Sequence, residues 1–168
     1  IYKGEALALR AFLHFDMLRL FGPSPIMGED LKAIPYMDSY TNIAKERSSV
    51  KEVLEKVVAD LNAARELMKE VDSYGPEYEN LKDSYADDRR LKNRYFHLNY
   101  YATTALLARV ELYAGHTQEA LNAAVEIIGE PENEPVQPFE LAIESSSEDR
   151  LFESEILFTL DIANLENI

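Results

Sequence analysis

The chain has 168 residues and a net charge of −14, which argues against nucleic acid and anionic membrane surfaces as partners, because both need clusters of Lys and Arg. The absence of cysteine excludes disulfides, thiolate metal sites and a cysteine nucleophile. With 46% apolar and 29% charged residues, the composition is that of one globular domain with a hydrophobic core.

Residues 2–21 are predicted to form the first helix, because the stretch is rich in Ala and Leu and contains neither proline nor a β-branched residue. Gly22 and Pro23 end it. At helical spacing its apolar residues fall on two opposite faces: Leu7, Ala8, Ala11, Phe15 and Leu18, and then Ala6, Leu9, Leu13, Met17 and Leu20. This pattern predicts a central helix covered on both sides, although one deeply buried helix of an ordinary bundle would also show it.

Residues 23–47 break the helical pattern with three prolines and a glycine. A connection of this length in a compact domain is usually functional or mobile, and this one carries Tyr36, Tyr40 and Asn42. The second helix is predicted to begin at Ser48 or Ser49, because Ser49 and Glu52 have the spacing of a capping box. Its apolar residues then lie on one face up to Val71, which predicts an amphipathic helix with one side in water.

Residues 72–94 are acidic and contain Tyr74, Tyr78 and Tyr85. Their carboxylates, beginning with Asp72, do not follow the ligand order of an EF-hand, which needs D-x-[DN]-x-[DN]-G and a Glu at the twelfth position. We therefore predict a solvated loop and no metal site. The three tyrosines are a second set of candidate aromatic contacts.

The third helix is predicted from about Arg94 to Ala114 and the fourth from Gln118 to about Ile128. Gly115 is suited to end the third, and Thr117 to cap the fourth. A link this short predicts an antiparallel pair, and the pair resembles a tetratricopeptide unit with small residues at its contact. Beyond Gly129 the chain is irregular, except for Glu155–Leu160, whose bulky apolar residues predict a short strand.

Two stretches resemble signatures of the SusD/RagB-like family, which comprises outer-membrane nutrient-binding lipoproteins of Gram-negative bacteria. The first reads Gly4-Glu5-Ala6, Leu9-Arg10-Ala11-Phe12, Phe15, Leu18-Arg19, Phe21-Gly22 and Pro25. The second reads Leu98-Asn99-Tyr100-Tyr101-Ala102, Ala105-Leu106-Leu107-Ala108-Arg109-Val110 and Leu112-Tyr113-Ala114-Gly115. The resemblance implies an all-α fold of irregular tetratricopeptide-like antiparallel helix pairs with long loops, in which residues 1–168 form a single helical domain.

The resemblance also implies a function: non-catalytic capture of glycans or other nutrient oligomers at the outer-membrane surface. The implied partner is a TonB-dependent, SusC-like transporter, and the implied membrane attachment is a lipid anchor upstream of Ile1. Because the chain begins within a helical pattern, we expect a fragment of a larger SusD-like domain. Loop residues build ligand sites in this family, so Tyr36, Tyr40 and Asn42 are candidate ligand contacts. The alternative is that they hold the loop to the helices.

Catalysis is not predicted, because the sequence lacks a P-loop, G-x-S-x-G and G-x-G-x-x-G, and its three histidines do not have zinc-motif spacing. His14 lies on a polar seam of the first helix one turn after Arg10, and we interpret it as structural. No cofactor and no metal site are expected. The alternative function is that of a tetratricopeptide-like adaptor for a protein segment, which would show a groove of Asn, Lys and Arg.

Overall fold

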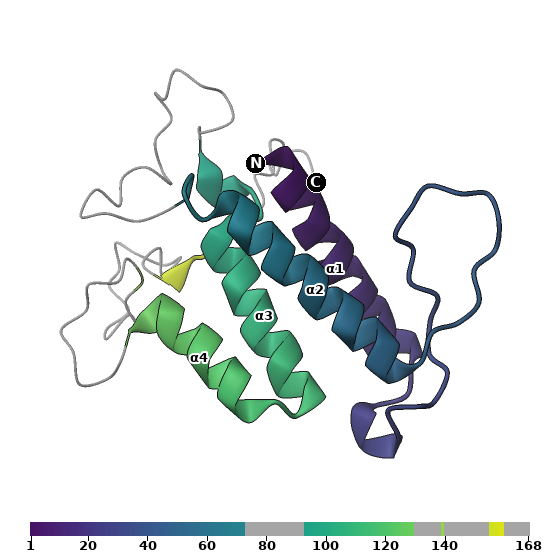
Figure 1. Ribbon diagram of the computed structural model, residues 1–168. Helices are drawn as coiled ribbons and strands as arrows, with labels where there is room; N and C mark the ends of the chain where they lie inside the picture. Colours follow the sequence, from purple (N-terminus) through teal and green to yellow (C-terminus); the bar gives the residue numbers. More distant parts are fainter. Residues whose placement is uncertain (73–92, 130–138, 140–154, 160–168) are drawn as a thin grey trace, which may run out of the picture.

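The computed structural model describes residues 1–72, 93–129, 139 and 155–159 (Figure 1). Four helices make up most of this part: α1 (Tyr2–Phe21), α2 (Val50–Met68), α3 (Tyr100–Ala114) and α4 (Thr117–Ile128). Two single 3-10 turns, η1 (Pro25–Met27) and η3 (Arg94–Phe96), lie between them. The predicted all-α class is confirmed.

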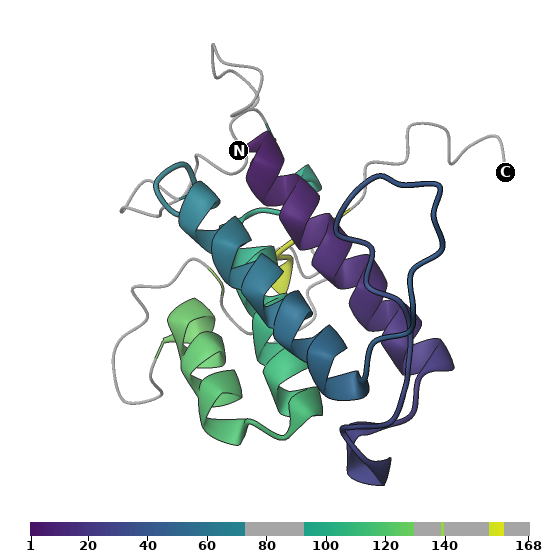
Figure 2. The same cartoon turned by 45° about the vertical axis from the view of Figure 1, so that its right-hand side comes forward.

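The helices pack in chain order, α1 on α2, α2 on α3 and α3 on α4, with successive helices antiparallel (Figures 1 and 2). Val53, Val57 and Leu61 of α2 are fully buried at the centre, between Phe15 of α1 and Val110 of α3. The predicted antiparallel pair is therefore present. At its contact Ala120 is buried and Ala108 is half-buried against the core.

The close approach of α1 to α2 depends on a glycine. A Cβ added at Gly4 would stand 2.7 Å from Cγ of Met68 and 3.2 Å from the carbonyl oxygen of Ala64. Gly4 opens the first family-like signature, so its position there has a packing reason.

Only one of the two apolar faces of α1 is covered by the described residues. Ala8, Phe15 and Leu18 are buried, whereas Leu9, Leu13 and Leu20 on the opposite face are about half or more exposed. The prediction of a helix covered on both sides is therefore not met within the described part of the chain, because α2 and α3 both lie on the same side of α1.

The ends of the helices follow local hydrogen bonding. At the start of α2 the predicted capping box is confirmed: Oγ of Ser49 accepts from the Glu52 amide at 3.2 Å, and Oε2 of Glu52 accepts from the Ser49 amide at 2.7 Å. Gly115 ends α3 with a left-handed φ of 88°, as predicted. Thr117 is not a cap but the first residue of α4.

The predicted start of the third helix at Arg94 is wrong, because α3 begins six residues later at Tyr100. Asn93 has a left-handed φ of 48°, and the chain then makes the single turn η3. Oδ1 of Asn99 accepts a hydrogen bond from the Ala102 amide at 2.9 Å and thereby caps α3. The side chain of Arg94 is held by ion pairs rather than by helical neighbours.

The predicted strand Glu155–Leu160 is also wrong, since residues 155–159 contain no strand; Leu160 lies outside the described residues. Two backbone groups of this segment form hydrogen bonds with residues 95 and 99. The Thr159 amide donates to the carbonyl oxygen of Tyr95 at 3.1 Å, and the Asn99 side-chain amide donates to the carbonyl oxygen of Leu157 at 2.8 Å. The segment therefore packs on η3 and the start of α3 instead of on a second strand.

Candidate functional site

The connection between α1 and α2 stands out from the helix pair as a projecting loop (Figures 1 and 2). Its two arms are paired at their base: the Ala33 amide donates to the carbonyl oxygen of Ser48 at 2.8 Å, and the Ser48 amide donates back to Ile34 at 2.9 Å. Lys32 and Ser49 form an isolated antiparallel bridge one step closer to α2. We refer to these paired arms as the neck and to residues 35–47 beyond them as the distal loop.

A polar cluster attaches the distal loop to both helices, and we call it the loop anchor: Arg10, His14, Tyr36 and Asp60. Arg10 of α1 binds Asp60 of α2 through two hydrogen bonds of 2.6 Å each. The Tyr36 hydroxyl donates to the same carboxylate at 2.5 Å, and Nη1 of Arg10 donates to the carbonyl oxygen of Asp38 at 2.9 Å. One arginine–carboxylate pair thus connects two helices and the loop.

The ionisation of these groups follows from this arrangement. The hydrogen bonding of Arg10 to the Asp60 carboxylate is the largest influence on Arg10 and raises the pKa of its guanidinium. Burial is the largest influence on Tyr36, and with the hydrogen bond to Asp60 it raises the pKa of the phenol well above its ordinary value. Arg10 is therefore a permanent cation and Tyr36 a permanent donor in this cluster.

His14 completes the loop anchor by stacking on Tyr36. The ring centroids are 4.0 Å apart with 28° between the planes. Nδ1 of His14 lies 2.8 Å from the carbonyl oxygen of Arg10, and Nε2 lies 2.9 Å from the amide nitrogen of Met37. This geometry supports the interpretation of His14 as structural.

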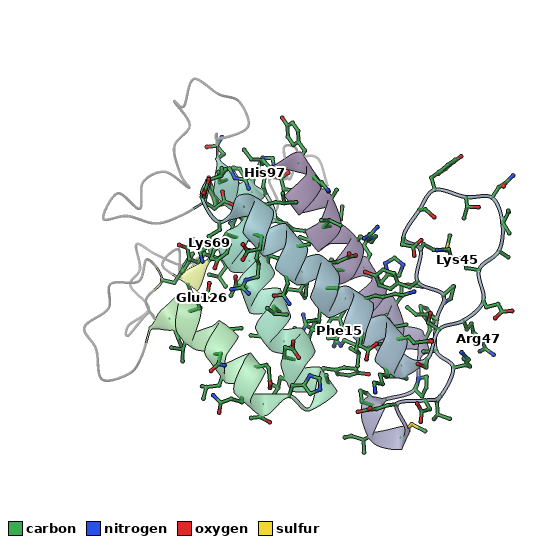
Figure 3. All side chains as sticks on the ribbon, viewed as in Figure 1. Phe15, Lys45, Arg47, Lys69, His97 and Glu126 are labelled. Carbon is green, nitrogen blue, oxygen red and sulfur yellow. The ribbon has the colours of Figure 1, made fainter. Side chains whose placement is uncertain are left out.

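The three residues predicted as ligand contacts do not lie together. Tyr36 is only 2% exposed, with its hydroxyl on Asp60 and its ring against His14, so it holds the loop to the helices, which is the alternative role. Tyr40 and Asn42 are exposed in the distal loop. Figure 3 shows Lys45 and Arg47 on the same loop, where Lys45 forms an ion pair with Asp38. Tyr74, Tyr78 and Tyr85 lie outside the described residues.

Asp60 is the residue of the loop anchor that the sequence reasoning did not single out. The sequence feature that could have identified Asp60 is its position in α2, one residue before the buried Leu61 and at the edge of the apolar face. A carboxylate there is largely removed from water and must be paired. Arg10 and His14, which share a polar seam of α1, were the available partners.

A second polar cluster lies at the other end of the helix bundle, and we call it the N-terminal clamp: Glu5, Asp72 and Arg94. Arg94 donates to both oxygens of Asp72, at 2.7 and 2.9 Å, and also pairs with Glu5. Oδ2 of Asp72 accepts from the Tyr100 amide at 3.0 Å. Burial would lower the pKa of Arg94, but its bonds and charges with Asp72 and Glu5 outweigh burial and raise it. The prediction that Asp72 belongs to a solvated loop is therefore wrong.

The described residues also line hollows outside these clusters. A groove of about 730 Å³ runs between α1, α3 and residues 155–158 and is lined mainly by apolar side chains, including Leu9, Phe12 and Leu106. A smaller hollow of about 270 Å³ lies beside Glu55, Glu111 and His116. Within the described ranges, no three His, Asp or Glu side chains are grouped as metal ligands, and none of the described helices is long and apolar enough to cross a membrane.

Comparison with known proteins agrees with the signatures in α1 and α3. A SusD-like family model, described as starch-binding associating with outer membrane, matches residues 2–83. A SusD superfamily protein from Bacteroides thetaiotaomicron VPI-5482 has a crystal structure that matches 83% of this chain at 27% identity with a TM-score of 0.60. A SusD-like carbohydrate-binding protein from Bacteroides vulgatus ATCC 8482 matches 73% of it at 25% identity with a TM-score of 0.55.

The chain is therefore similar to SusD/RagB-like proteins, in sequence over residues 2–83 and in fold over most of its length. It spans about a quarter of the length of the solved structures, 26% of the first and 23% of the second. No curated protein matched the chain.

Proposed function

We propose that the protein captures glycans at the bacterial outer-membrane surface without chemical turnover. The match of residues 2–83 to a family model described as starch-binding associating with outer membrane supports this proposal. One of the similar solved structures is described as a carbohydrate-binding protein. We further propose that the bound glycan passes to a TonB-dependent, SusC-like transporter, and that a lipid anchor outside this chain attaches the protein to the membrane.

Within this chain we propose that Tyr40 and Asn42 contact the ligand. Tyr40 exposes its ring in the distal loop, where an aromatic face can stack on a sugar ring and the Asn42 amide can bond a hydroxyl. Tyr36 does not contact the ligand in this proposal but positions the loop, because it fixes the loop to α1 and α2. Since the chain spans a quarter of its relatives, we expect glycan binding by residues 1–168 to be weak.

The adaptor alternative is less well supported. An adaptor for a protein segment would need a groove rich in Asn, Lys and Arg. The larger groove is lined mainly by apolar side chains, with Arg109 as a basic member. We therefore retain glycan capture as the proposed function.

A glycan array followed by saturation-transfer NMR tests the proposal, because that NMR method detects weak binding. We expect Tyr40→Ala and Asn42→Ala to remove most of the saturation transfer to the selected glycan. Tyr2→Ala is the matched control, since Tyr2 is also an exposed tyrosine but lies at the start of α1. The absence of saturation transfer from the parent chain to every glycan of the array would contradict the function, and equal transfer in Tyr40→Ala would contradict the site.

A further inference from the structure

The two ring nitrogens of His14 have opposite roles in hydrogen bonding. Nδ1 faces the carbonyl oxygen of Arg10, which can only accept a hydrogen bond, so this nitrogen carries a proton. Nε2 faces the amide N–H of Met37, which can only donate, so this nitrogen must be without one. The contact between α1 and the distal loop therefore requires the neutral imidazole in one tautomer.

A second proton on His14 is incompatible with this contact. It would bind to Nε2 and point at the Met37 amide hydrogen, across a nitrogen–nitrogen distance of 2.9 Å. The hydrogen bond would be replaced by two donors facing each other, whereas the bond from Nδ1 to Arg10 would be unaffected. Protonation therefore acts selectively on the side of the imidazole that holds the loop.

The charges around His14 do not compensate for a second proton. On α1 Arg10 lies one turn before His14, and its guanidinium is already paired with Asp60 of α2. Lys56 of α2 lies 5.6 Å from the centre of the Tyr36 ring on which His14 stacks. From the loop, Asp38 is paired with Lys45. A protonated His14 would thus lie near two cations, Arg10 and Lys56. The neighbouring carboxylates, Asp60 and Asp38, are already paired with other cations.

We propose that His14 is a pH-sensitive latch, which holds the distal loop on α1 while the imidazole is neutral and releases it at Met37 when the imidazole gains a proton. Histidine is the side chain that changes its charge between about pH 5 and pH 8. The neck is held by backbone hydrogen bonds between Ala33, Ile34 and Ser48, which carry no titratable group, so we expect it to stay closed. The expected motion is therefore confined to the distal loop. It is expected whether or not this loop binds a glycan.

The absence of cysteine allows a direct test on the whole chain. Ala44→Cys in the distal loop and Ala63→Cys on α2 introduce two exposed positions for spin labels, and electron-spin resonance then measures the distance between them. We expect a distance distribution in the parent that broadens between about pH 8 and about pH 5. His14→Gln should give the same distribution at both values, because a glutamine carbonyl can accept from Met37 but does not titrate. Circular dichroism of each labelled protein verifies that its helices are intact.

His116→Gln in the same labelled background is the matched control, because His116 lies at the start of α4 and pairs with Glu111. Its distribution should broaden at low pH as in the parent. Two outcomes would overturn the proposal: a parent distribution that does not change with pH, or a pH-dependent change in His14→Gln as large as in the parent. The second outcome would assign the response to a group other than His14.

Discussion

The loop anchor and the N-terminal clamp are built from the same chemistry in different surroundings. Each joins one arginine to a carboxylate of the α2 region and thereby ties α1 or a neighbouring turn to it. In the loop anchor the side chains of Arg10 and Asp60 are 29% and 13% exposed. In the N-terminal clamp those of Arg94 and Asp72 are 2% and 0% exposed.

This difference in exposure predicts different roles. When one partner of a buried pair is removed, the other remains as an uncompensated charge without water. At the loop anchor water can reach the remaining charge and replace part of the lost bonding. The clamp should therefore dominate the stability of the fold, whereas the anchor can open at a smaller cost.

Arg94→Met should destabilise the protein most, by about 3–5 kcal/mol, because it leaves Asp72 buried with no cation. Chemical denaturation followed by circular dichroism measures this loss. Arg19→Met is the control, since Arg19 is in an exposed pair with Asp16 and should cost less than about 1 kcal/mol. Equal effects of the two substitutions would remove the distinction between buried and exposed pairs.

Tyr36→Phe should cost about 2 kcal/mol, because it removes a hydrogen bond to the charged Asp60 but keeps the ring against His14. Tyr40→Phe should leave the unfolding free energy unchanged, since Tyr40 is fully exposed. The same denaturation experiment compares the two tyrosines. A loss in Tyr40→Phe as large as in Tyr36→Phe would mean that both hydroxyls are structural.

Ser49→Ala should lower the unfolding free energy by about 1 kcal/mol, the usual effect of a lost N-cap. It thus measures what an uncharged hydrogen bond beside the neck contributes to stability. Ser24→Ala is the control, because Ser24 precedes η1 without a side-chain capping bond. Thermal unfolding of the two variants gives the difference. If Ser24→Ala lowered the stability more, the capping box would not be the relevant contact.

His116→Gln should have the smallest effect and only at low pH. A hydrogen bond and the charge of Glu111 raise the pKa of the exposed His116, so the protonated form favours the folded state. The stability difference from the parent should be fully present below the ordinary histidine pKa of about 6.5 and should vanish as the pH rises through the raised value. Thermal unfolding across this range measures it. Glu111→Gln should show the same trend. A stability difference from the parent that grows with pH would mean that the protonated His116 does not favour the folded state.

The helices could be predicted because their apolar spacing, caps and glycine stops are local. Arg94 could not be placed in the same way. It lies in a helix-compatible stretch before Tyr100. Its bonds to Asp72 and Glu5, together with the left-handed Asn93 and the Asn99 cap, keep it outside α3. Asp72 was misjudged for the same reason, since an acidic segment looks solvated until its cation is known.

The candidate site shows the same limit. Tyr36 and Tyr40 are four residues apart in one irregular segment, and nothing local separates a buried tyrosine from an exposed one. The difference comes from Asp60, which α2 brings to the Tyr36 hydroxyl. The apolar residues of 155–159 likewise fit a strand until Asn99 and Tyr95 are seen to take their backbone bonds.

The chain-order packing of α1 through α4 has a consequence for how the protein folds. Most helix contacts join neighbours along the sequence, and chains with such local contacts fold quickly. The α3–α4 pair is joined by two residues, whereas α1 and α2 must close residues 22–49, and the entropy of closing a loop grows with its length. We expect α3 and α4 to pair early and the α1–α2 contact to form later. Shortening the distal loop should then speed folding while the unfolding rate changes little.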